Sequence, residues 1–156
     1  MIKIEIPGYK EYNLKNLVLD YNGTMSCDGE LINGLKEIII SVSKLLDIHV
    51  LTADTYGSVE SKLKDLPVTL SIIPSVNQDE QKLNYIKMLG SKSTVCVGNG
   101  RNDSLMLKNS IIGIALIQDE GLCIDSLNNA DIVCKDILSA LQLLINKKRI
   151  IATLRN

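Results

Sequence analysis

The segment Leu17-Val-Leu-Asp-Tyr-Asn-Gly-Thr24 is an apolar run that ends on an acidic residue and then turns. An apolar run of this length is typical of a buried strand, and Asn22-Gly23 is a strong turn pair. An ionised carboxylate at the edge of a buried sheet needs a metal ion or hydrogen bonds to compensate its charge. Asp20 is therefore predicted to be a nucleophile or a metal ligand, at the sheet edge where open α/β folds bind ligands.

The composition indicates a single domain, residues 1–156, with an aliphatic core. Hydrophobic residues make up 46% of the chain, yet Trp and Phe are absent. Ile, Leu and Val suit strands that are covered on both faces by helices. The net charge of −1 gives no basic surface for nucleic acid. The four cysteines form no C-x-x-C pair and no apolar run is long enough to span a membrane, so we expect a reduced, cytoplasmic protein.

Extended and helical patterns alternate along most of the chain. Alternating Ile2–Ile6, the turn at Pro7-Gly8 and a second extended piece predict an N-terminal β-hairpin within residues 1–16. In the core, residues 17–146, we expect strands at 17–21, 48–52, 68–73, 94–97, 111–116 and 132–134. Helices are expected at 33–46, 56–64, 79–89, 103–108, 120–128 and 136–145. This order predicts a Rossmann-like α/β fold, with a mainly parallel sheet flanked by helices.

Four polar clusters fall at the ends of predicted strands or in the connections that follow them. These clusters are Asp20–Thr24, Thr52, Lys82 and Gly98–Asp103. Because parallel strands end at one edge of a sheet, the clusters are expected to converge there.

Together these side chains are suited to phosphoryl transfer. A carboxylate such as that of Asp20 can attack phosphorus to give an acyl phosphate. The phosphoryl oxygens then need a cation and neutral donors, which Lys82 and the hydroxyl of Thr52 would supply. Magnesium would reduce the repulsion between the carboxylate and the phosphoryl group.

Asp20-x-Asn22-Gly23-Thr24, Thr52, Lys82 and Gly98-Asn99-Gly100-x-Asn102-Asp103 resemble the four motifs of the haloacid dehalogenase superfamily. The last motif is similar to Gly-Asp-Gly-x-Asn-Asp in the phosphorylation domain of P-type ATPases. The resemblance spans about residues 17–134 and is greatest to small, soluble, P-type-ATPase-like hydrolases. It implies a magnesium-dependent phosphohydrolase, a phosphatase or a soluble ATPase-like enzyme, that acts through an aspartyl phosphate.

The resemblance also implies roles for individual residues. Asp20 would be the nucleophile, and Asn22 occupies the position at which related phosphatases carry an acid/base Asp. The phosphate-binding group would be Gly23, Thr52, Lys82 and Asn102. The metal-binding group would be Asp20, the backbone carbonyl of Asn22, Asn99 and Asp103.

Two asparagines depart from the pattern of that superfamily. Asn22 cannot exchange a proton near neutral pH, and the loss of a general acid/base typically costs about 10²–10⁴ in rate. Asn99 stands where the superfamily has a metal-binding Asp, so metal binding should be weaker. The alternative to an enzyme is therefore a regulatory module that binds phosphate with little turnover.

The intervals from Thr24 to Thr52 and from Thr52 to Lys82 each span about 30 residues. The predicted helices and strands fill them, so neither can hold a cap domain. The pocket is expected to be open, and a large substrate or a second subunit of a homo-oligomer would have to cover it. The expected substrate is a phosphorylated small molecule or a nucleotide.

These residues also resemble features of other protein classes, which the rest of the sequence excludes. Gly98-x-Gly100 is not a dinucleotide-binding loop, because Asp103 stands where the third Gly belongs. A signalling receiver domain would carry an acidic pair before its phosphorylated Asp, and none precedes Asp20. Asp54 is predicted to be a helix N-cap, and Asp28 a turn acid in a short flap. The basic segment 147–149 is predicted to be a solvated end.

Overall fold

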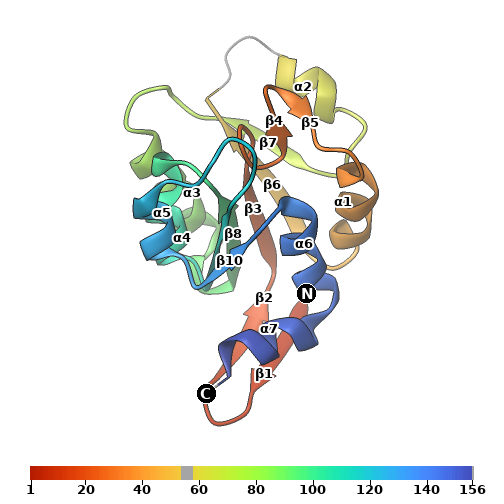
Figure 1. Cartoon of the computed structure of the whole chain (residues 1–156), viewed down its shortest axis with the longest axis vertical. Coiled ribbons are helices and arrows are strands. Elements are labelled where there is room, and N and C mark those ends of the chain that lie inside the picture. The colour runs from red at the N-terminus through yellow and green to blue at the C-terminus, as the bar shows by residue number, and fades with distance from the viewer. Residues whose placement is uncertain (54–57, 156) are drawn as a thin grey trace.

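The structure, a computed structural model, describes residues 1–53 and 58–155. Its centre is a six-stranded sheet in the order β10-β9-β8-β3-β6-β7, with every neighbouring pair parallel (Figure 1). These strands are β3 (Asn16–Asp20), β6 (Asp47–Thr52), β7 (Thr69–Ile72), β8 (Thr94–Gly98), β9 (Ile112–Leu116) and β10 (Ile132–Cys134). The predicted parallel α/β sheet is confirmed, and each strand lies within one residue of its expected bounds.

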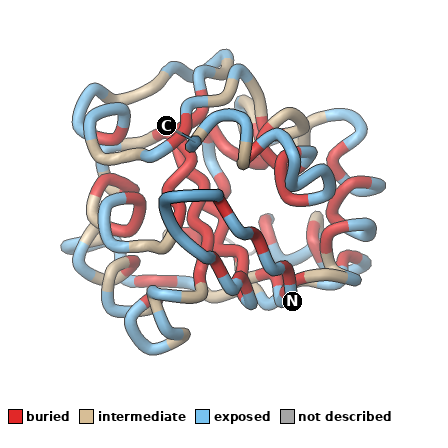
Figure 2. Tube along the Cα trace, turned by 90° about the horizontal axis from the view of Figure 1, so that it is seen from below, coloured by how far each residue is buried: buried red, intermediate tan, exposed pale blue. Residues whose placement is uncertain are grey.

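The burial of the strands explains their aliphatic sequences. β3, β8 and β9 are buried along their whole length, whereas the edge strands β7 and β10 have exposed positions. Along β3, Leu17 and Leu19 pack on one face of the sheet and Val18 on the other. Buried residues gather in the strands and exposed residues on the surrounding helices and loops (Figure 2). A central strand covered on both faces needs apolar residues at every position, not only at alternate ones.

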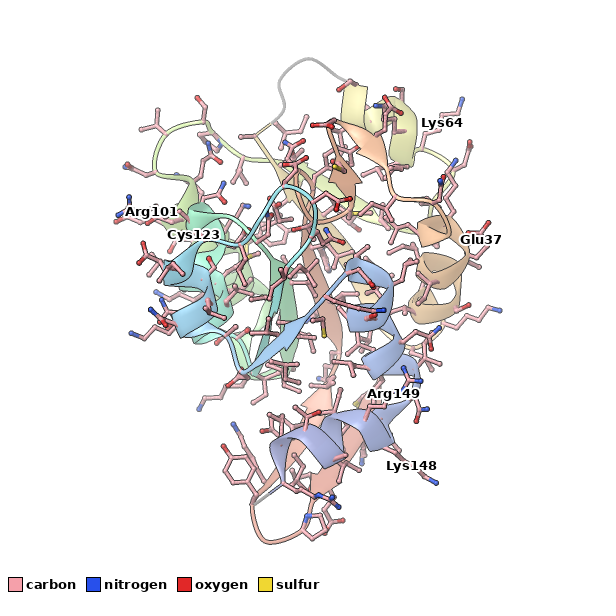
Figure 3. All side chains as sticks on the ribbon, in the orientation of Figure 1. Glu37, Lys64, Arg101, Cys123, Lys148 and Arg149 are labelled. Atoms are coloured by element: carbon pink, nitrogen blue, oxygen red, sulfur yellow. The ribbon has the colours of Figure 1, made fainter. Side chains whose placement is uncertain are left out.

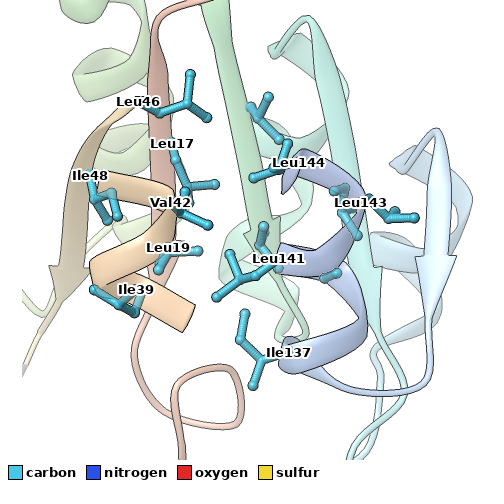
Figure 4. Close-up of a cluster of buried hydrophobic side chains, with 14 of the residues drawn as sticks. Leu17, Leu19, Ile39, Val42, Leu46, Ile48, Ile137, Leu141, Leu143 and Leu144 are labelled. Atoms are coloured by element: carbon cyan, nitrogen blue, oxygen red, sulfur yellow. The ribbon is translucent and has the colours of Figure 1, made fainter. Parts of the chain in front are cut away.

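Two layers of helices cover the sheet. On one face lie α1 (Leu35–Ser43) and α6 (Ile137–Ile145), which contact each other across the core. The other face is covered by α3 (Gln78–Leu89), α4 (Ser104–Asn109) and α5 (Ile124–Asn129). Figure 4 shows Val42 of α1 and Leu141 of α6 facing each other over Leu19 of β3. None of the described helices is long and apolar enough to cross a membrane.

The N-terminal hairpin forms as predicted, from β1 (Ile2–Ile6) and β2 (Lys10–Leu14) in antiparallel register. The inward residues of β1 belong to the same hydrophobic cluster as the sheet. A further helix, α7 (Lys147–Leu154), packs against β1 through Ile150, which is fully buried. The basic segment 147–149 is exposed as expected, and Lys148 and Arg149 point away from the hairpin (Figure 3). It is nevertheless the first turn of this helix, which the sequence did not predict.

Only small elements occupy the two places where a cap could be inserted. After β3, the chain forms a hairpin of β4 (Ser26–Cys27) and β5 (Glu30–Leu31), here called the flap. Its turn residues Asp28 and Gly29 have φ angles of 50° and 79°, as a type I′ turn requires. After β6, the described chain resumes with α2 (Ser58–Leu63). The described residues therefore contain no cap domain, whereas the predicted N-cap Asp54 lies outside them.

The burial of Ile150 predicts that α7 stabilises the hairpin. Removing its side chain in Ile150→Ala should lower the free energy of unfolding by about 2–5 kcal/mol, because it leaves a cavity between α7 and β1. Urea unfolding measures this loss. The matched control is Ile124→Ala, whose side chain is 64% exposed and should change stability by no more than about 0.5 kcal/mol. Equal losses in the two variants would contradict the packing of α7.

Candidate active site

The sheet brings the predicted motifs to one edge. In the register, Asp20 of β3 lies beside Leu51 of β6, and Leu19 lies beside Val97 of β8. Thr52 and Gly98 are the next residues of those two neighbouring strands. The convergence expected from the strand ends is therefore confirmed.

A buried ion pair network joins three of these segments. The Nζ atom of Lys82 donates hydrogen bonds to Oδ1 of Asp20 and to Oδ1 of Asp103, both at 2.6 Å. The side chain of Lys82 is 1% exposed, that of Asp103 is 0% and that of Asp20 is 10%. Lys82 lies one turn into α3, so this contact ties α3 to the carboxyl ends of β3 and β8. Asp20 is the member of the network that reaches solvent.

Asp103 is held by the loop that follows β8. Its Oδ2 atom accepts hydrogen bonds from the backbone N–H groups of Asn99 at 3.0 Å and Gly100 at 2.9 Å. A Cβ atom on Gly98 would lie 2.4 Å from this carboxylate, so only glycine allows the close approach. Both oxygens of Asp103 thus have partners in the described chain. Its expected place among the metal ligands stays a prediction.

The turn after β3 packs directly against Asn99. Gly23 has a φ of 74°, and a Cβ there would lie 2.4 Å from Nδ2 of Asn99. Asn99 accepts a hydrogen bond from the hydroxyl of Thr24 at 3.3 Å and donates one to the carbonyl of Gly121 at 2.9 Å. The N–H of Gly23, an expected phosphate donor, donates to the carbonyl of Ser26. Glycine is therefore required at this position for both its backbone angle and its contact.

Gln118 is a residue of this region that sequence reasoning missed. Its Nε2 atom donates to the carbonyls of Gly23 at 2.7 Å and Thr24 at 2.9 Å, while its Oε1 accepts from the N–H of Ile137 at 2.8 Å. Gln118 thereby joins the turn after β3 to the first residue of α6. It follows the end of β9 by two residues, so its position at the sheet edge can be inferred from the sequence but its hydrogen-bond partners cannot.

A pocket of about 470 Å³ opens beside Asp20. Four predicted site residues line it: Asp20, Asn22, Thr52 and Asn102. The other four, Gly23, Lys82, Asn99 and Asp103, lie outside its lining and support those that line it. The amide of Asn102 donates to Oε1 of Gln78, another lining residue, at 2.7 Å.

The flap and α2 form a charged rim on this pocket. Asp28, Gly29 and Glu30 of the flap line it, as do Ser58 and Lys62 of α2. Lys62 donates to the carbonyl of Gly29 at 2.5 Å and pairs with Glu30 at 2.8 Å. The rim is therefore fixed by contacts between the flap and α2.

Arg101 lies outside this rim. Its side chain is 85% exposed, pairs with Asp125 at 3.2 Å and points outward from the loop (Figure 3). Arg101 is therefore a solvent-exposed residue of this loop.

The electrostatics of the network oppose ionisation of Asp20. Burial and the nearby Asp103 raise the pKa of Asp20 to about 7, although Lys82 acts in the opposite direction. Burial alone would lower the pKa of Lys82, but the two carboxylates prevail and raise it. Lys82 therefore remains a cation at neutral pH.

The donor set beside the pocket fits a hard divalent cation. Asp20 and Asn22 offer carboxylate and carbonyl oxygens, which are the ligands that Mg²⁺ prefers, and both residues line the pocket. Among the described residues, every buried side-chain nitrogen or oxygen already has a hydrogen-bond partner. A cation would therefore bind at the solvent-facing side of Asp20, where the residues are open to water.

The raised pKa of Asp20 predicts a pH-dependent stability of the metal-free protein. The folded state binds the Asp20 proton more tightly than the unfolded state does. The contribution of this proton to the free energy of unfolding is therefore complete below the ordinary pKa of 3.8 and is lost as the pH rises through about 7. We expect the stability of the wild type relative to Asp20→Asn to fall across this window. Urea unfolding in EDTA between about pH 4 and 8 measures it, and a flat or rising difference would contradict the shift.

No family model matches the chain. Over 66 residues it is 47% identical to an uncharacterized protein of Methanocaldococcus jannaschii, a match that covers 42% of this chain and 71% of that protein.

Three solved structures share the fold. The cobalt-bound deoxy-D-mannose-octulosonate 8-phosphate phosphatase of Haemophilus influenzae has a TM-score of 0.73 at 13% identity, covering 92% of this chain and 94% of that one. The corresponding enzyme of Moraxella catarrhalis, in complex with magnesium, phosphate and KDO, has a TM-score of 0.66 at 18% identity and covers 91% and 94%. A zinc-transporting PIB-type ATPase in the E2.Pi state has 0.64 at 22%, covering 79% of this chain and 20% of that one. The chain therefore has the fold of the haloacid dehalogenase superfamily and belongs to one family with the archaeal protein.

Proposed function

We propose that this protein is a magnesium-dependent phosphohydrolase in which Asp20 is the nucleophile and carries the phosphoryl group as an aspartyl phosphate. The observation that carries the proposal is the position of Asp20. It is a carboxylate in the wall of a pocket, and one of its oxygens is bound by a buried lysine that a second carboxylate holds in place. A carboxylate attacks phosphorus readily only when the charge of the phosphoryl group is neutralised nearby.

The residues around Asp20 supply what that reaction needs. Lys82 provides positive charge beside the attacking group, and Thr52 and Asn102 offer neutral donors from the pocket wall. Asp20 and the carbonyl of Asn22 would hold Mg²⁺ at the pocket wall, and Asn99 and Asp103, the other two predicted ligands, would support them from behind it. The ion would supply charge that offsets the repulsion between two anions.

The fold neighbours support the same reaction class. Two of them are phosphatases, and one was crystallised with magnesium and phosphate. We therefore propose a phosphorylated small molecule or a nucleotide as the substrate. The pocket is open in the described part of the chain, so a second copy of the chain, or a large substrate, would cover it.

An assay of phosphate release tests the proposal. With Mg²⁺ and a panel of phosphate esters, acetyl phosphate and ATP, the wild type should turn over at least one substrate. Asp20→Asn should reduce this rate by about a thousandfold or more, because it removes the nucleophile and keeps the shape. EDTA should abolish the activity and Mg²⁺ should restore it.

The matched control for that assay is Asp47→Asn, an exposed carboxylate at the opposite end of β6, which should retain wild-type activity. Binding of phosphate or beryllofluoride without any turnover would contradict the enzyme and favour a phosphate-binding regulatory module.

Asn22 predicts a gain of function. The variant Asn22→Asp restores a proton-exchanging group beside the pocket, so the rate of phosphate release should rise by up to about a hundredfold. Gln78→Glu is the matched control, because it adds a carboxylate to the same pocket and still accepts the hydrogen bond of Asn102. An unchanged or lower rate in Asn22→Asp, or an equal gain in the control, would contradict the proposal that Asn22 occupies the acid/base position.

A further inference from the structure

Hydrolysis of an aspartyl phosphate requires a base for the attacking water. Asn22 occupies the position that would supply it, and its amide cannot accept a proton near neutral pH. The described residues that line the pocket include three carboxylates, those of Asp20, Asp28 and Glu30. His49, the single histidine, does not line it. The base for the second half of the reaction is therefore to be sought among these three.

Two of the three carboxylates have another role or an ion-pair partner. Asp20 carries the phosphoryl group in the intermediate and cannot also activate water. Glu30 is paired with Lys62 at 2.8 Å, across the rim of the pocket. The carboxylate of Asp28 makes no hydrogen bond or ion pair with any described residue, although one of its oxygens lies within 4.8 Å of Sγ of Cys27 and of a Glu120 carboxylate oxygen, two residues outside the pocket lining. Asp28 is also exposed, so that water reaches it.

The backbone of the flap fixes Asp28 at the rim. Its N–H donates to Oε1 of Glu120 at 2.9 Å on one side. On the other side, the carbonyl of the next residue, Gly29, accepts a hydrogen bond from Lys62 of α2 at 2.5 Å. The left-handed φ angles of the type I′ turn complete this arrangement. Asp28 therefore lies in the lining of the pocket, in a turn that is held at both ends, and no described residue pairs with its carboxylate.

We infer that Asp28 is the general base that dephosphorylates the enzyme, an inference that rests on the proposed function. A carboxylate oxygen of Asp28 takes a proton from a water molecule while the water oxygen forms a bond to phosphorus. The bond between phosphorus and the Asp20 oxygen breaks, and its electron pair returns to the Asp20 carboxylate. Inorganic phosphate leaves, and Asp28 then releases its proton to solvent.

The lifetime of the phosphoenzyme tests this role. The full chain is phosphorylated with ³²P-labelled acetyl phosphate and Mg²⁺, unlabelled donor is added in excess, and the decay of protein-bound label is followed. Asp28→Asn should slow this decay by about 10²–10⁴-fold and leave the rate of label incorporation within a few-fold of wild type. A residue with a merely structural role would alter both rates. The variant should fold, because Asn-Gly is a preferred pair for the type I′ turn.

Two further variants sharpen the test. Glu120→Gln removes a neighbouring carboxylate outside the pocket lining, keeps the oxygen that accepts the N–H of Asp28, and should leave the decay within a few-fold of wild type. Asp54→Asn tests whether the acid at position 54, two residues after Thr52 in the sequence, is the base instead of Asp28. An Asp28→Asn decay equal to wild type, or a slow decay only in Asp54→Asn, would overturn the inference and leave the phosphohydrolase intact. If no donor labels the wild type in a way that depends on Asp20, both the role of Asp28 and the proposed phosphohydrolase are overturned.

Discussion

The lysine that bridges two buried carboxylates is the contact on which the rest of the site depends. Moving charged groups out of water costs several kcal/mol for each ion, and their attraction offsets this only when the geometry is good and the remaining oxygens are hydrogen-bonded. Asp103 meets that condition through two backbone N–H groups, and Lys82 meets it through two carboxylates. Because β3, α3 and the loop after β8 each contribute one charge, their relative positions are fixed together.

The amide of Asn99 is suited to its surroundings in a way that a carboxylate would not be. It donates to the carbonyl of Gly121 and packs against Gly23, at a distance that leaves no room for a side chain there. A carboxylate at this position would face that carbonyl with no proton to donate. The departure from the superfamily pattern is thus accompanied by a matching partner in this chain, and the turn after β3 is positioned by hydrogen bonds as well as by charge.

Local sequence predicted much of this architecture. The strands were located because β3, β8 and β9 are aliphatic at every position, a pattern that depends only on neighbouring residues. Helix α7 was missed because its first turn is basic and a single residue, Ile150, is fully buried. The role of Gln118 was missed because it depends on backbone groups at residues 23, 24 and 137, whose proximity no local pattern records.

The sequence by itself determined the order of the strands of the central sheet and of the helices between them, and the residue types at the sheet edge, including Asp20 and Lys82. Periodicity and residue type are local properties, and parallel strands bring their ends together in any sheet of this kind. Only the tertiary structure decided which of those residues face the pocket and which stand behind it. That division separates Asp20, Thr52 and Asn102 from Lys82, Asn99 and Asp103. Burial and hydrogen-bond partners come from segments far apart in the chain, so they exist only once the chain has folded.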